Sequence, residues 1–120
     1  LEEYNSEYER YGEGYNKEKA ISRYREALSK RSSYTHARWN LVKIYLQSED
    51  YQNAILELKE IIKIEPYNSD PFYEIAKIYV KMDDKENAIE YYDKTIEFWS
   101  KDSVRLKEIK KELKDFRKET

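Results

Sequence analysis

The stretch AIEYYDKTIEF, residues 88–98, is the last of three similar segments that stand a fixed distance apart. AILELKEIIKI begins at Ala54 and AISRYREALSK begins at Ala20, so both intervals are 34 residues (88 − 54 and 54 − 20). In each segment the positions i, i+4 and i+7, apolar except for Thr95, have the spacing of one face of an α-helix. Self-similarity with a period of about 20–50 residues is typical of stacked repeats. The sequence therefore predicts three repeat units, over residues 1–34, 35–68 and 69–102.

Each unit carries another apolar stripe ahead of the quoted segment, so each is expected to fold as two short amphipathic helices. Neither helix could bury its apolar face alone, and neighbouring units must therefore stack. Only two glycines and two prolines occur in 120 residues, which also favours helix. The expected inward residues are Tyr4, Tyr8, Tyr11, Ala20, Tyr24, Ala27, Leu41, Val42, Tyr45, Ala54, Leu58, Ile61, Ile75, Ala76, Tyr79, Ala88, Tyr92 and Thr95.

The segments between these stripes contain residues that begin and end helices. Asp50 and Asp84 are predicted to cap the second helices of their units by accepting hydrogen bonds from free N–H groups. Asp70 is predicted to be a cap followed by Pro71 in the first turn, where a missing N–H has no consequence. Pro66 is predicted to end the second helix of the middle unit.

Residues 103–120 are predicted to form a single capping helix. Leu106, Ile109, Leu113 and Phe116 share one face, and lysines and glutamates occupy the rest, as expected of a helix that closes a stack. Further repeats on either side are the alternative. Leu1 is not an initiator methionine, so we expect the chain to belong to a longer protein.

The repeats resemble the tetratricopeptide repeat family over essentially the whole chain. The residues that carry the resemblance are WNLVKIY (39–45), DYQNAI (50–55), EPYN (65–68), FYEIAKIY (72–79) and ENAIEYY (86–92). The first unit departs from the pattern, with Tyr8 where the family prefers a small residue and with Gly12 and Gly14 near the end of its helix. The resemblance implies an all-α fold, an α-solenoid of three helix-turn-helix repeats plus a C-terminal capping helix, and a non-catalytic module that binds proteins.

Composition argues against most other kinds of function. The formal net charge is −2 with both signs mixed, which gives no general attraction to nucleic acid or to an anionic membrane. No apolar run is long enough to span a bilayer. His36 is the only histidine and there is no cysteine to complete a zinc site, so we expect no metal. The sequence also contains no glycine-rich phosphate loop and no nucleophile elbow, so we expect no cofactor and no catalytic residue. A cytoplasmic location is favoured.

The first helix of each unit lines the groove in this family, and the resemblance implies groove positions in this sequence. They are Glu2, Asn5, Glu9, Gly12, Glu13, His36, Trp39, Lys43, Leu46, Gln47, Asp70, Tyr73, Lys77, Val80 and Lys81, with Lys107, Lys111 and Lys114 from the cap. Family members that bind the acidic tail of heat-shock chaperones do so with Lys, Asn, Asn, Lys and Arg. The corresponding positions in this sequence are Asn5, Glu9, Asn40, Asp70 and Glu74. Only Asn40 matches, and the three carboxylates would repel an acidic tail, which argues against that ligand.

We predict that a partner is bound by Trp39, Lys43, Leu46, Tyr73, Lys77, Lys81, Lys107 and Lys111. Trp39 and Tyr73 are expected to lie off the inward stripes as aromatic anchors, and the lysines to favour an acidic peptide or a free carboxylate. The alternative for the lysines is that they only keep the surface soluble. The alternative function is a scaffold that forms homo-oligomers through its terminal helices.

Overall fold

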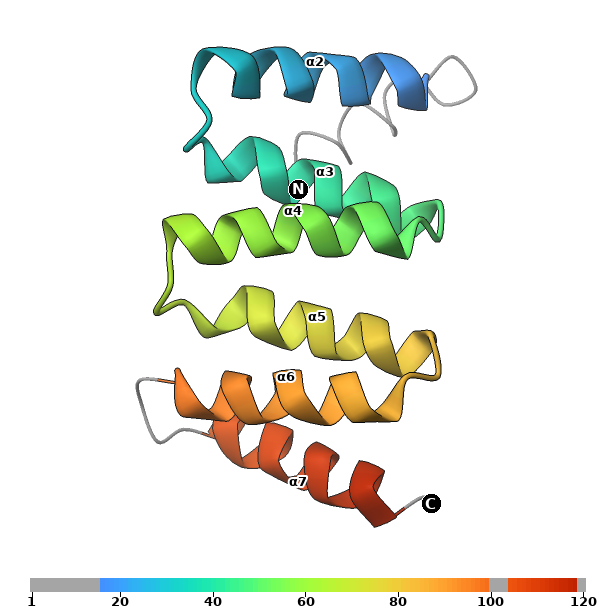
Figure 1. The fold of residues 1–120 in the computed structure, drawn as a ribbon, viewed down its shortest axis with the longest axis vertical. Helices are drawn as coiled ribbons and strands as arrows, with labels where there is room; N and C mark the ends of the chain where they lie inside the picture. The colour runs from blue at the N-terminus through green and yellow to red at the C-terminus, as the bar shows by residue number, and fades with distance from the viewer. Residues whose placement is uncertain (1–15, 100–103, 119–120) are drawn as a thin grey trace. The chain divides into compact units, whose positions relative to one another are not determined.

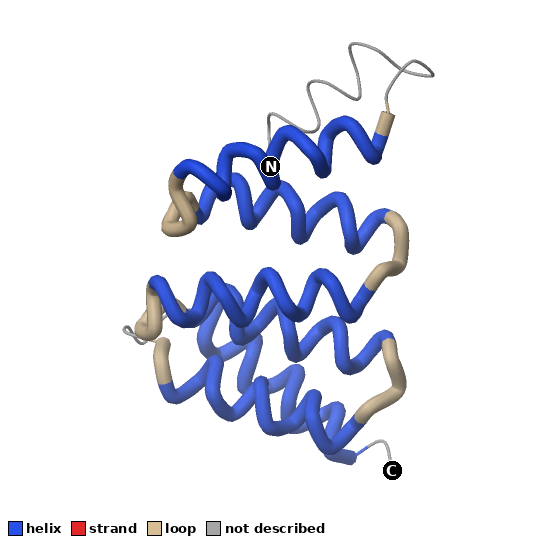
Figure 2. The backbone as a smooth tube through the Cα atoms, turned by 45° about the horizontal axis from the view of Figure 1, so that its top comes forward, coloured by secondary structure: helices blue, strands red, loops and turns tan. Residues whose placement is uncertain are grey.

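The computed structural model describes residues 16–99 and 104–118, and within them every regular element is an α-helix (Figures 1 and 2). The helices are α2 (Lys17–Lys30), α3 (Thr35–Gln47), α4 (Tyr51–Ile64), α5 (Ser69–Lys81), α6 (Lys85–Glu97) and α7 (Val104–Lys118). The predicted first helix of the first repeat, with Tyr4, Tyr8 and Tyr11, lies outside the described residues. The chain separates into two compact parts, residues 1–64 and 65–120. These two parts are named the first unit and the second unit, and the 34-residue segments are named repeats.

In the first unit, α3 packs against both α2 and α4. The predicted stripe of α4 is confirmed, because Ala54, Leu58 and Ile61 are all fully buried. Ala20 of α2 packs on Ile44 of α3, beside the partly buried side chains of α2. In the first unit the helices therefore pack through faces on which an apolar residue recurs at about every helical turn.

In the second unit, α6 packs against both α5 and α7. Its core contains Tyr73 and Ala76 from α5, Tyr92 from α6, and Ile109 and Leu113 from α7. The predicted inward face of α7 is confirmed, because Leu106 is buried and Phe116 is partly buried as well.

The turn between the two helices of a repeat has the same geometry in both units. Glu49 and Asp83 have φ angles of 57° and 59°, in the left-handed region, although neither is glycine. The next residue caps the following helix in each case. An Asp50 side-chain oxygen accepts from the N–H of Asn53 at 3.3 Å, and Asp84 caps α6 in the same way. Both capping predictions are confirmed.

The predicted cap before Pro71 is wrong by two residues. The cap is Asn68, whose side chain accepts a hydrogen bond from the N–H of Asp70 at 3.0 Å. Helix α5 begins at Ser69, which places Pro71 at its third position. The first N–H groups of a helix have no partner within the helix, so proline is tolerated anywhere in this turn. The prediction for Pro66 is confirmed, since α4 ends at Ile64.

Enlarging the buried alanines tests the predicted helix faces. Ala54 and Ala88 are fully buried, so Ala54→Leu and Ala88→Leu should each lower the free energy of unfolding by about 1–3 kcal/mol through overpacking. Lys59→Leu, on an exposed position of α4, should change it by less than about 0.5 kcal/mol. Urea unfolding of the three variants gives these values. Equal losses at buried and exposed positions would show that the helix faces are assigned incorrectly.

Candidate functional site

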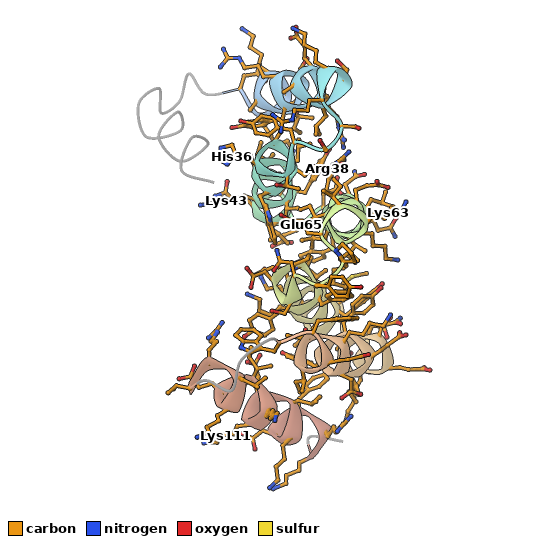
Figure 3. All side chains as sticks on the ribbon, turned by 90° about the vertical axis from the view of Figure 1, so that its left-hand side faces the viewer. His36, Arg38, Lys43, Lys63, Glu65 and Lys111 are labelled. Carbon is orange, nitrogen blue, oxygen red and sulfur yellow. The ribbon has the colours of Figure 1, made fainter. Side chains whose placement is uncertain are left out.

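Three predicted partner-binding residues lie on one side of α3, where Trp39, Lys43 and Leu46 are spaced at i, i+4 and i+7. Each is partly exposed, whereas the opposite face of the helix is buried. Trp39 lies off the fully buried stripe, as predicted. Figure 3 shows Lys43 on one side of α3 and Arg38 on the other. Lys43 forms no ion pair with any described residue.

Tyr73 of α5 lies in a different environment from the one predicted. Its side chain is only 9% exposed, so the expectation that it lies off the inward stripe is wrong. Two cations lie near its ring, with Lys77 Nζ at 4.6 Å and Arg105 Cζ at 5.1 Å from the ring centre. Arg105 belongs to α7, so a side chain from another helix lies over this ring. Contact between Tyr73 and a partner stays a prediction.

A carboxylate on α7 ties the three helices of the second unit together. Glu112 accepts a hydrogen bond from the Tyr73 hydroxyl at 3.0 Å and another from the Tyr92 hydroxyl at 2.5 Å. Burial, followed by the hydrogen bond to Glu112, raises the pKa of both tyrosine hydroxyls above the ordinary value of 10.0. Both hydroxyls therefore stay protonated at neutral pH and remain donors to this carboxylate.

Sequence reasoning missed the role of Glu112, because it is one of many glutamates on a highly charged helix. A signal was nevertheless present. Tyr92 was predicted to point inward, and a buried tyrosine needs a partner for its hydroxyl, which a phenylalanine would not. A carboxylate on the next helix was therefore to be expected.

Next to these hydrogen bonds, α5, α6 and α7 surround a hollow of about 240 Å³. It is lined by Val80, Tyr92, Glu112, Asp115 and Phe116. Val80 is one of the groove positions that the family resemblance implies, and its side chain is 37% exposed. The hollow thus combines apolar surface with two carboxylates, so this part of the predicted groove is not purely basic.

The lysines of the second unit that were predicted to bind a partner differ in whether they form ion pairs within the chain. Lys77 forms an ion pair with Glu74 at 2.8 Å, so part of its charge is compensated within α5. Lys81, Lys107 and Lys111 are exposed and form no ion pair with described residues. A preference for acidic ligands at this face would therefore rest mainly on the latter three lysines.

The first unit contains a buried ionic cluster that sequence reasoning also missed. Glu57 of α4 is 4% exposed. Its carboxylate binds Arg25 of α2 at 2.6 Å and Arg38 of α3 at 2.9 Å. Arg38 also donates to the backbone oxygen of Ser32 at 2.9 Å, and Arg25 donates to the hydroxyl of Tyr45 at 3.0 Å. The cluster joins α2, α3 and α4. Every charge in it has a partner, so its role is structural.

The same two positions are aromatic in the second unit. Phe72 and Tyr91 lie 34 residues after Arg38 and Glu57, and their ring centres are 6.3 Å apart. One repeat therefore joins its two helices with an ion pair and the next with aromatic rings. In the sequence, the ionic cluster could have been found by comparing these two positions between one repeat and the next.

In residues 16–99 and 104–118, no group of three or more His, Cys, Asp or Glu side chains is placed to hold a metal ion. His36, for which no role as a metal ligand was predicted, is exposed, and its ring centre lies 5.8 Å from that of Tyr34. None of the described helices is long and apolar enough to cross a bilayer.

Paired short helices that repeat at a fixed interval define the chain as an all-α helical-repeat protein, an α-solenoid. The family model for the tetratricopeptide repeat matches residues 35–68 and 69–98, which together are more than half of the chain. The chain belongs to the tetratricopeptide repeat family. It is accordingly a protein–protein interaction module, and proteins of this family are generally non-catalytic scaffolds.

Comparison with solved structures gives the same fold. Thirty-eight chains match, among them the crystal structure of MamA protein, with a TM-score of 0.61 and 21% sequence identity. The match covers 92% of this chain and 64% of that one, so the chain spans less than two thirds of the length of this relative. No curated protein matches the sequence significantly.

Proposed function

We propose that the chain binds an extended segment of a protein partner, and that in the second unit this segment lies on the face shared by α5 and α7. The observation that carries the proposal is the hollow of about 240 Å³ beside Val80, which offers partly exposed apolar surface at a groove position. An apolar side chain of the ligand would occupy it. The neighbouring carboxylates Glu112 and Asp115 would accept hydrogen bonds from the backbone N–H groups of the ligand.

In the first unit, Trp39 serves as the anchor in this proposal, flanked by Lys43 and Leu46. Partly exposed tryptophans are favoured at binding surfaces, because a large ring is buried with little loss of conformational freedom. Lys43, Lys81, Lys107 and Lys111 favour acidic residues in the ligand, and they set the association rate and its dependence on salt.

The test uses peptides selected from a random twelve-residue phage library on the full chain. Trp39→Ala is expected to weaken the selected peptides by at least about 2 kcal/mol, as loss of a buried anchor does. Val80→Asp, which places a third carboxylate at the hollow, is expected to weaken them about tenfold or more. Fluorescence anisotropy of labelled peptides measures both affinities.

Lys59→Ala on α4 provides the control, because its exposed side chain belongs to neither proposed face. It should leave the affinities within about twofold of the parent chain. Peptides that bind the Trp39→Ala and Val80→Asp variants as tightly as the parent would place the working surface elsewhere and refute the proposal.

Self-assembly is the second function to be tested. Val104 on the terminal helix α7 is 74% exposed, so this apolar side chain is available to another copy of the chain. Sedimentation velocity over a wide concentration range separates the two functions. A docking module should stay monomeric without its ligand, whereas a scaffold should associate as the concentration rises.

A further inference from the structure

A second hollow, of about 500 Å³, lies between α6 and α7. The residues that line it are Asp93, Ile96, Lys110, Leu113, Lys114, Arg117 and Lys118. None of them lines the smaller hollow beside Val80, and only Lys114 belongs to the groove positions that the family resemblance implies. The larger hollow is therefore a separate feature of the second unit.

The charge of this lining is strongly positive. Four cations face one carboxylate, which gives a local charge of +3 (4 − 1) in a chain whose net charge is −2. Asp93 is already engaged, since both of its oxygens lie 3.1 Å from the guanidinium of Arg117. Lys110, Lys114 and Lys118 form no ion pair or hydrogen bond with described residues. Three lysine charges around this hollow therefore have no counter-charge among the described residues.

The same lining includes apolar side chains. Ile96 of α6 and Leu113 of α7 contribute to it, and most of the surface of the hollow is apolar. A single phosphate would meet the lysines but leave this surface uncovered. Sites for single-stranded nucleic acid commonly offer aromatic rings on which the bases stack, and no aromatic side chain lines this hollow. A ligand that carries both carboxylates and an apolar side chain matches all of these features.

We propose that the α6–α7 hollow is a docking site for an acidic peptide segment of a protein partner. Glutamates or aspartates of the segment pair with Lys110, Lys114 and Lys118, while an apolar side chain lies against Ile96 and Leu113. The Arg117–Asp93 ion pair joins α7 to α6 beside the hollow. This site goes beyond the proposed function, because its lining shares no residue with the hollow beside Val80 and because two of its three lysines, Lys110 and Lys118, are not groove positions.

The experiment uses a fluorescein-labelled twelve-residue peptide of glutamates and leucines, titrated with the full chain and followed by fluorescence anisotropy. Saturable binding that weakens as salt is added is expected. A peptide with lysines in place of the glutamates should not bind. Tripolyphosphate serves as the small-anion competitor, and binding of tripolyphosphate without binding of the acidic peptide would overturn the proposal.

Charge reversal locates the site. Lys110→Glu with Lys114→Glu should weaken the acidic peptide by at least about tenfold, because like charges then face the ligand. Lys59→Glu with Lys63→Glu on α4 is the matched control, with the same spacing, the same change of net charge and exposed positions. It should change the affinity by less than about twofold once salt screens distant charges. Thermal melts check that both pairs fold, and Lys110→Gln with Lys114→Gln replaces the reversal if it does not.

Equal weakening by both pairs would show general electrostatic attraction and overturn the proposal. Loss of the acidic peptide in Val80→Asp would assign it to the α5–α7 face and overturn the proposal too, while supporting the function proposed above. Conversely, library-selected peptides that ignore Val80→Asp, together with an acidic peptide that needs Lys110 and Lys114, would refute the first proposal and leave this one standing.

Discussion

Deletion of residues 103–120 is expected to make the remaining chain aggregate or unfold without cooperativity. Ile109 is fully buried and Leu113 is 4% exposed, and both pack in the core of the second unit with Tyr92. The deletion also removes Glu112, which leaves the Tyr92 hydroxyl without its acceptor. Newly exposed apolar surface of this kind drives association of partly folded chains. Sedimentation velocity and thermal melting followed by circular dichroism measure both effects.

A single substitution tests the same helix without shortening the chain. Ile109→Ala is expected to lower the free energy of unfolding by about 2–5 kcal/mol, which combines lost burial with the cavity left behind. Lys111→Ala on the exposed side of α7 should change it by less than about 0.5 kcal/mol. A truncated chain that remains a soluble, cooperatively folding monomer would show that α7 is an appendage and not a cap.

The second large effect is expected at the buried carboxylate of the first unit. Glu57→Leu should lower the free energy of unfolding by about 3–5 kcal/mol, because the nearly buried guanidinium of Arg38 is then left without a counter-charge. The control is Lys63→Ala, which breaks an exposed ion pair with Glu60 and should cost less than about 1 kcal/mol. Urea unfolding of the two variants gives the comparison.

The second unit suggests a double substitution that should restore the stability lost in Glu57→Leu. Placing the aromatic residues of the second unit at the same positions, Arg38→Phe with Glu57→Tyr, should recover most of the stability lost in Glu57→Leu. Apolar pairs commonly replace buried ion pairs without loss. If Glu57→Leu is no more harmful than Lys63→Ala, the ionic cluster does not hold α2, α3 and α4 together.

The helical period could be predicted from sequence because it depends on residue size and polarity at fixed spacing. Ala54 and Ala88 recur where close helix packing leaves no room for a larger side chain, and both are fully buried. Asp50 and Asp84 could also be assigned, since a cap depends only on the residue and the few positions that follow it. Local rules sufficed for these features.

Tyr73 and Glu57 could not be placed in the same way, because their environments depend on neighbouring helices. Tyr73 is covered by Arg105, which comes 32 residues later in the chain (105 − 73). Glu57 is buried because two arginines from other helices reach its carboxylate. A glutamate and a tyrosine at such positions look like boundary residues until the partner helix is known.

The direct test of the proposed α5–α7 binding face is amide hydrogen exchange, followed by mass spectrometry, on the full chain with and without a saturating library-selected peptide. We expect slower exchange in residues 70–81 and 105–116 when the peptide is bound, because these segments flank the hollow beside Val80. Slower exchange confined to α2 and α4, with α5 and α7 unchanged, would contradict the proposal.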